Sequence, residues 1–185
     1  MSSELPGESA EDLRKQAAVL LPVHRDLDGV LHLTLVRRSA GGRHAGQLAF
    51  PGGNRDPGDV DLRATVLREA QEEIGLDPGD VDIVGELPPV DTRTTGFRIF
   101  PFIGRLRQST GQWRLQAAEI AGVVEVALND LTAPDARQER MLSFPSWPEP
   151  RLTPVIPIGE DLLWGVTLRI LVAALPRLLD GSLQL

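Results

Sequence analysis

The chain has 185 residues, 42% hydrophobic residues and a formal net charge of −7 at pH 7. This length suffices for one domain with a substantial core, and the acidity disfavours nucleic acid as a partner. The absence of cysteine excludes disulfides and a thiol nucleophile, no apolar run approaches the ~20 residues that span a bilayer, and no signal peptide is visible. We therefore expect one cytoplasmic domain over 1–185, with 1–12 as a flexible tail and no membrane partner.

Hydrophobic periodicity divides the chain into strands and two main helices. Strands are expected at Ala17–Val23, Val30–Arg37, Val81–Leu87, Arg98–Leu106 and Val123–Val126. Helices are expected at Asp61–Ile74 and Leu162–Leu179, the second ended or kinked by Pro176. The stretch from Ala133 to Pro154 is rich in proline and predicts an irregular surface loop. Strands interleaved with two helices favour an α/β fold, a sandwich of helices on a mixed sheet.

The first of these helices carries three carboxylates within five positions. At about 100° per residue, Glu69, Glu72 and Glu73 occupy one arc roughly 100° wide. Like charges at this spacing destabilise an isolated helix, and a hard divalent cation bound through oxygen would remove the penalty. The alternative is a solvated acidic helix face without a ligand.

Residues on both sides of the helix define its ends. Gly52 and Gly53 follow an apolar run and allow a tight turn with close backbone approach to a ligand. Asp59 or Asp61 can cap the helix, and Gly75 ends it in the usual manner. The carboxylates thus lie in the last turns of a loop–helix–loop unit.

This unit resembles the Nudix box, which reads G-x5-E-x7-R-E-U-x-E-E-x-G-U with U apolar. Gly53 matches the first glycine, and the distal half is matched by Arg68, Glu69, Ala70, Glu72, Glu73, Gly75 and Leu76. Two departures occur at the middle glutamate. Asp59 stands in that position, and eight residues rather than seven separate it from Arg68.

The segment from Leu35 to Gly53 is similar to the signature that precedes the Nudix box in coenzyme A pyrophosphatases, roughly L-L-T-x-R-S-x3-R-x3-G-x3-F-P-G-G. Arg38-Ser39 and the run from His44 to Gln47 fit it, whereas the stretch between Arg43 and Gly46 is one residue short. The substrate-binding residues that this resemblance implies are Arg38, Ser39, Arg43, Gln47, Gly52 and Gly53. Their alternative role is structural, as a loop packed beneath the glycine turn.

The resemblance implies a Nudix-type α/β/α sandwich around a mixed β-sheet and a metal-dependent hydrolase. Coenzyme A or acyl-CoA would be cleaved at the pyrophosphate, giving 4′-phosphopantetheine and adenosine 3′,5′-bisphosphate. Mg²⁺ or Mn²⁺ would be held by Glu69, Glu72 and Glu73, with Glu72 and Glu73 also catalytic. Glu119, just ahead of a short strand, is a third catalytic candidate, as base or further ligand, and its alternative is a surface role. Arg68 is expected to pair with a neighbouring carboxylate and orient it.

Other functions remain open from the sequence. The same family architecture serves hydrolases of ADP-ribose, dinucleoside polyphosphates or oxidised nucleotides. A catalytically silent Nudix-like binding module would typically have lost a distal glutamate, and a metal-stabilised scaffold is the third alternative. Phe97 and Trp164 could stack on adenine, although core packing explains both. The assembly expected is a monomer or a homodimer.

Overall fold

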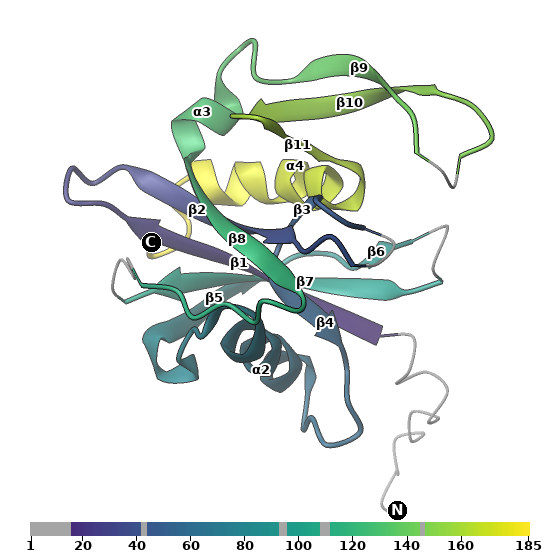
Figure 1. Ribbon diagram of the computed structural model, residues 1–185. Coiled ribbons are helices and arrows are strands. Elements are labelled where there is room, and N and C mark those ends of the chain that lie inside the picture. Colours follow the sequence, from purple (N-terminus) through teal and green to yellow (C-terminus); the bar gives the residue numbers. More distant parts are fainter. Residues whose placement is uncertain (1–15, 42–43, 93–95, 108–111, 145–146) are drawn as a thin grey trace, which may run out of the picture.

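The computed structural model describes residues 16–41, 44–92, 96–107, 112–144 and 147–185. The expected N-terminal tail and Arg43 therefore lie outside the described residues. With the labels of Figure 1, the elements in chain order are β1 (Gln16–Arg25), β2 (Leu31–Arg38), β3 (Leu48–Ala49), β4 (Gly52–Asn54), α2 (Leu62–Ile74), η1 (Pro78–Asp80), β5 (Val81–Glu86), β6 (Val90–Asp91), β7 (Arg98–Leu106), β8 (Ile120–Ala127), α3 (Leu128–Thr132), β9 (Gln138–Leu142), β10 (Arg151–Ile158), β11 (Asp161–Trp164) and α4 (Gly165–Leu179).

Two sheets organise these strands. The larger runs in the order β3-β2-β1-β7-β5, with β4 pairing β1, β6 pairing β7 and β8 pairing β2. It is mixed, because β1 and β7 are parallel while β2 is antiparallel to β1. The smaller sheet is antiparallel, in the order β11-β10-β9. The predicted strands are confirmed as β1, β2, β5, β7 and a longer β8.

Apolar side chains project from both faces of β1, with the period of two that a strand imposes. Leu21 and Val23 belong to a core shared with α4, and Ala18 and Leu20 belong to a core shared with α2. Figure 1 shows α4 above the larger sheet and α2 below it. The predicted α/β/α sandwich on a mixed sheet is confirmed.

Helix α2 begins and ends where its caps predict. The Asp61 carboxylate accepts a hydrogen bond from the Ala64 N–H at 2.7 Å. Gly75 adopts a left-handed φ of 70°, and its N–H donates to the Gln71 carbonyl. The helix therefore occupies 62–74, with Asp61 as the residue before its first turn.

The predicted irregular loop from Ala133 to Pro154 is wrong in part, because β9 and the start of β10 lie within it. Proline density suggested a loop, since proline removes a ladder donor. Pro154 nevertheless pairs across the ladder with Glu139. The buried pair Val155 and Ile156 anchors β10 immediately afterwards, which accounts for a strand despite its prolines.

The last helix also differs from its prediction. Residues from Asp161 to Trp164 pair with β10 as β11, so α4 starts at Gly165 rather than Leu162. Pro176 does not end it, because the helix continues to Leu179 and the buried Leu178 anchors its last turn. None of the helices in the described ranges is long and apolar enough to cross a membrane.

Two strands pair with one edge of β1 at different positions along it, and the site lies at the division between them. Residues 17–19 of β1 pair with β4, whereas residues 23–25 pair with β2. Because β7 occupies the other edge of β1, β2 and β4 must diverge from each other along it. The loop between β3 and α2 lies at this division.

Candidate functional site

Gly52 joins the loop before α2 to strand β1. Its φ of 148° favours glycine, and a Cβ at this position would lie only 2.2 Å from the Ala18 carbonyl oxygen. This close approach lets the Gly52 N–H donate to Glu73 Oε2 at 2.9 Å. The first glycine of the pair thus fixes one of the predicted catalytic carboxylates through the backbone.

Gly53 makes room for another carboxylate of the helix. A Cβ at Gly53 would lie 2.5 Å from both Cδ and Oε1 of Glu69. Glu69 is mostly buried, with its side chain 15% exposed. The paired glycines therefore admit two glutamates of α2 to the loop, Glu73 at the first and Glu69 at the second.

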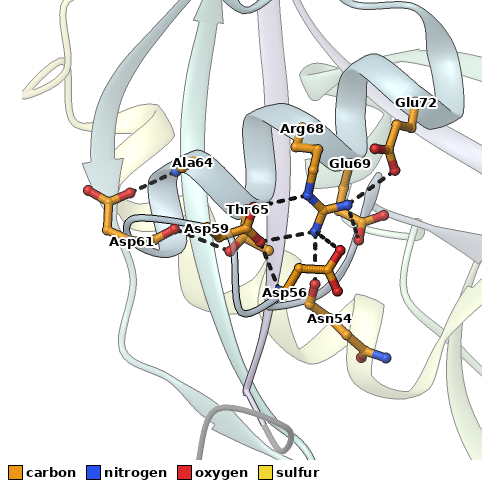
Figure 2. A network of polar contacts seen from close by, with 9 residues as sticks. All are labelled: Asn54, Asp56, Asp59, Asp61, Ala64, Thr65, Arg68, Glu69 and Glu72. Carbon is orange, nitrogen blue, oxygen red and sulfur yellow. Dashed lines mark hydrogen bonds and ion pairs between the residues drawn. The ribbon is translucent and has the colours of Figure 1, made fainter. Parts of the chain in front are cut away.

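Arg68 lies at the centre of the polar network in Figure 2. Its guanidinium donates from Nε and Nη2 to the two oxygens of Asp59, both at 3.0 Å. From Nη1 it donates to Glu69 at 3.0 Å and to Glu72 at 3.1 Å. The Asn54 carbonyl at 3.1 Å and the Asp56 carboxylate at 3.8 Å complete its partners. The prediction that Arg68 pairs with a neighbouring carboxylate is confirmed.

Both carboxylate oxygens of Asp59 accept hydrogen bonds from Arg68. The hydrogen bond from Arg68 lowers the pKa of Asp59 to about 2, and the same contact raises the pKa of Arg68. The Asp59 side chain is 7% exposed. The aspartate in the middle position of the motif therefore serves to hold the arginine that holds Glu69 and Glu72.

Glu73 is buried, with 2% of its surface exposed. Burial raises the pKa of Glu73 to about 7, against the Gly52 hydrogen bond and the charge of Arg38, which both lower it. The charges of Glu69 and Glu119 raise it further. The fold thus buries a carboxylate whose ionised form is disfavoured unless a cation lies beside it.

The pKa of Glu69 is raised by similar causes. Burial raises the pKa of Glu69, Arg68 opposes this shift, and Glu72 and Glu119 add to it. Because Glu119 acts on both Glu69 and Glu73, it lies within electrostatic range of the two glutamates. Its role as base, further ligand or surface residue stays a prediction.

The backbone positions Glu119 beside the end of β2. Its carbonyl accepts from the Ser39 N–H at 2.8 Å, and Arg38 is the register partner of Ile120. The Glu119 side chain is exposed. Strand β8 thus brings this carboxylate to the same place as the segment predicted to bind substrate.

Within that segment, the polar groups have different surroundings. Arg38 is half-buried at the end of β2, and its charge acts on Glu73. The Ser39 hydroxyl donates to the Ala117 carbonyl at 3.0 Å, and the Gln47 amide oxygen lies 3.1 Å from His44 Nδ1. Among these described side chains, Arg38 is therefore the one whose charge acts on Glu73. Ser39 contacts the segment before β8, and Gln47 contacts His44 within its own loop.

The donor set has the chemistry of a site for a hard divalent cation. Carboxylate oxygens suit Mg²⁺ or Mn²⁺, and the raised pKa values of Glu69 and Glu73 reflect negative charge that such an ion would neutralise. Among the described residues, no three acidic or histidine side chains already converge in a metal-binding geometry. Glu69 and Glu72 are turned toward Arg68, so ion binding would require them to change partners.

One part of the site was not identified from sequence. Asp56 joins the Arg68 network from the loop, and its signal is the Asp-Pro-Gly turn, which fixes the chain near the helix start. Trp164, considered for adenine stacking, packs against Phe144 with ring centroids 4.6 Å apart. Trp164 thus belongs to an aromatic cluster with Phe144 and Trp147.

Comparisons with known proteins agree with the sequence motif and the fold. A family model described as NUDIX domain matches residues 14–147. An uncharacterized Nudix hydrolase NudL of Citrobacter koseri is 46% identical over 118 residues, which cover 63% of this chain and 59% of that protein. The NudL of Salmonella paratyphi B is 44% identical over 115 residues, covering 62% and 58%. The chain thus spans about three fifths of the length of these relatives.

Solved structures share the fold. The NUDIX domain of Shewanella oneidensis NrtR, crystallised with ADP ribose, has a TM-score of 0.56 at 19% identity and covers 89% of this chain and 88% of its own. A MutT/nudix family protein from Enterococcus faecalis has a TM-score of 0.59 at 16% identity, covering 96% and 66%. At these identities the likeness concerns the fold alone.

Proposed function

The chain belongs to the Nudix family, and on that premise we propose that it hydrolyses the diphosphate bond of coenzyme A or acyl-CoA. The observation that carries a hydrolytic role is the contact of the paired glycines with two buried glutamates, Gly52 with Glu73 and Gly53 with Glu69. The choice of coenzyme A rests on the signature from Leu35 to Gly53. The charge of Arg38 beside Glu73 supports a place for a substrate phosphate there.

The metal in this proposal is Mg²⁺ or Mn²⁺, held by Glu69, Glu72 and Glu73. When bound, such an ion lowers the pKa of a water and neutralises charge on phosphate oxygens. The protein supplies the arrangement around it. The Gly52 N–H fixes Glu73. In the absence of an ion Arg68 holds Glu69 and Glu72 on one side of the helix, and both would exchange this contact for the ion.

The remaining chemical task is removal of the proton of the attacking water. Glu119 is the carboxylate proposed for it, since it is exposed to solvent and acts electrostatically on both Glu69 and Glu73. A positioned base typically contributes about 10²–10⁴ in rate. Arg38 is proposed to bind a phosphate oxygen, because a guanidinium matches phosphate geometry.

A panel of substrates distinguishes the alternative functions that the sequence left open. The chain retains all three distal glutamates, which favours an enzyme over a silent module. Coenzyme A, an acyl-CoA, ADP-ribose and a dinucleoside polyphosphate are each incubated with Mg²⁺ or Mn²⁺, and products are identified by mass. Release of 4′-phosphopantetheine is expected. Cleavage of ADP-ribose without cleavage of any CoA would reject the substrate and retain the reaction class.

A further inference from the structure

A cavity lies on the face of the larger sheet opposite α2. Its volume is about 760 Å³, and it is lined by Pro89, Val90, Asp91 and Arg169. Val90 packs against the core on the α4 side, and Arg169 comes from α4 itself. The proposed hydrolysis uses none of these residues.

Strand register relates this cavity to the glycine loop. Val90 pairs with Ile99, Ile99 with Ala17, and Ala17 with Asn54, the residue after Gly53. The cavity is therefore level with the loop, three strand spacings away, or about 14 Å at ~4.8 Å per spacing. An extended nucleotide derivative whose diphosphate lies at the loop can reach across this distance.

Arg169 gives the cavity a positive charge. Within the part of the chain that the structure describes, no side-chain hydrogen bond or ion pair engages its guanidinium, in contrast to Arg37 and Arg68, which hold carboxylates. Arg169 is exposed to solvent and follows directly after the first turn of α4. That turn has no side-chain cap from Trp164.

The other described charges at the cavity do not neutralise Arg169. Among the lining residues that the structure describes, Asp91 is the one carboxylate, and it lies 3.8 Å from Arg98. Its charge is therefore offset by Arg98, while Arg169 has no such partner among the described residues. Pro89 and Val90 add an apolar wall. A ligand with an anionic group next to a flat or apolar part fits this lining.

We propose that the cavity binds a phosphate monoester on the ribose of the substrate, with Arg169 as its principal contact. A guanidinium can donate two parallel hydrogen bonds to phosphate, and Asp91 can accept one from a ribose hydroxyl. The inference rests on the proposed function only in taking the substrate to be a nucleotide. Arg169 would thereby determine specificity without touching the scissile bond.

Calorimetric titration of the metal-free protein tests this binding without turnover. The probes are adenosine 3′,5′-bisphosphate, adenosine 2′,5′-bisphosphate and AMP. Wild type is expected to bind one bisphosphate at least about tenfold more tightly than AMP, and the preferred isomer identifies the position of the phosphate. Arg169→Gln is expected to remove the preference, while Arg140→Gln, an exposed arginine on β9, retains it.

Two results would overturn the assignment. One is wild-type protein that binds all three nucleotides equally or none of them. The other is Arg169→Gln protein that keeps the bisphosphate preference. Hydrolysis of coenzyme A against 3′-dephospho-coenzyme A separates the two proposals: a preference for bisphosphate without cleavage of coenzyme A rejects only the substrate, whereas equal cleavage of both compounds rejects only the phosphate subsite.

Discussion

Replacing Gly53 by alanine separates the catalytic arrangement from the stability of the fold. The added Cβ would lie 2.5 Å from the Glu69 carboxylate, so Glu69 must move. Its carboxylate is the far end of a flexible side chain and can move at a small cost in stability. The backbone at Gly53 does not have a positive φ, so alanine also reduces the entropy of the unfolded chain.

The expected loss of stability for Gly53→Ala is therefore within about 1 kcal/mol. The loss of activity is expected to be much larger. Displacement of a catalytic group by about 1 Å can cost ~10²-fold in rate, and the clash at Gly53 requires a displacement of that order. A folded protein with about 100-fold lower kcat is the expected result.

Two other glycines provide matched controls. At Gly52 the added Cβ meets the Ala18 carbonyl oxygen at 2.2 Å, and φ is 148°. Because backbone cannot retreat as a side chain can, Gly52→Ala should lower the free energy of unfolding by more than about 3 kcal/mol. At Gly58 nothing lies within 4 Å of the added Cβ, so Gly58→Ala should keep wild-type activity and stability.

Urea unfolding gives the free energies, and initial rates on the substrate identified by mass give kcat. The reasoning is refuted if Gly53→Ala retains wild-type turnover. It is equally refuted if Gly52→Ala unfolds at the same urea concentration as Gly58→Ala, because the close contact with β1 would then carry no energy.

Three further changes test separate parts of the site and fold. Glu119→Gln should lower the rate at saturating Mg²⁺ by about 10²-fold or more if Glu119 is the base; a shifted Mg²⁺ midpoint with a normal plateau would indicate a ligand, and an unchanged curve a surface residue. Arg38→Ala should raise KM for coenzyme A more than it changes kcat, and the reverse pattern would contradict a binding role. Burial lowers the pKa of His24, so its folded-state value lies below the unfolded value near 6.5. The contribution of His24 to stability is therefore complete above that pH and falls as the pH drops below it. Between pH 7.5 and 5 the urea midpoint of His24→Leu should therefore fall less than that of wild type. The exposed control His44→Gln should show the same fall as wild type.

The strongly periodic elements were predictable from sequence. The alternation of β1 and β2, the caps of α2 and the apolar run of β7 all lead to the observed elements. The smaller sheet was not predictable in the same way, because β9 is exposed along most of its length and has no apolar alternation. The proline residues of β10 then favoured a loop.

The site was predictable in composition and less so in burial. The acidic residues of α2 were identified, but Glu73 was grouped with Glu69 and Glu72 on one arc. Glu73 follows Val66 by seven residues, and positions seven apart on a helix differ by only about 20° in direction. Glu73 therefore shares the buried direction of Val66, and the 2% exposure of Glu73 follows from that.

The partner of Arg68 also depended on three-dimensional information. Asp59 was identified as the residue in the middle motif position, but no sequence pattern gives the direction of a loop side chain. The fold turns Asp59 back onto Arg68. The cavity at Arg169 likewise depends on the fold, which brings α4 beside the segment of β6, and periodicity alone cannot supply that neighbourhood.

The most direct test of the central claim is a paired measurement on Glu73→Gln, which keeps the shape of the side chain and removes its charge. Affinity for Mn²⁺ and turnover at saturating Mn²⁺ are measured together for wild type, Glu73→Gln and the exposed control Glu139→Gln on β9. The account expects weaker Mn²⁺ binding and at least about 100-fold lower kcat for Glu73→Gln alone. Turnover close to wild type at saturating metal, in a folded Glu73→Gln protein, would contradict it.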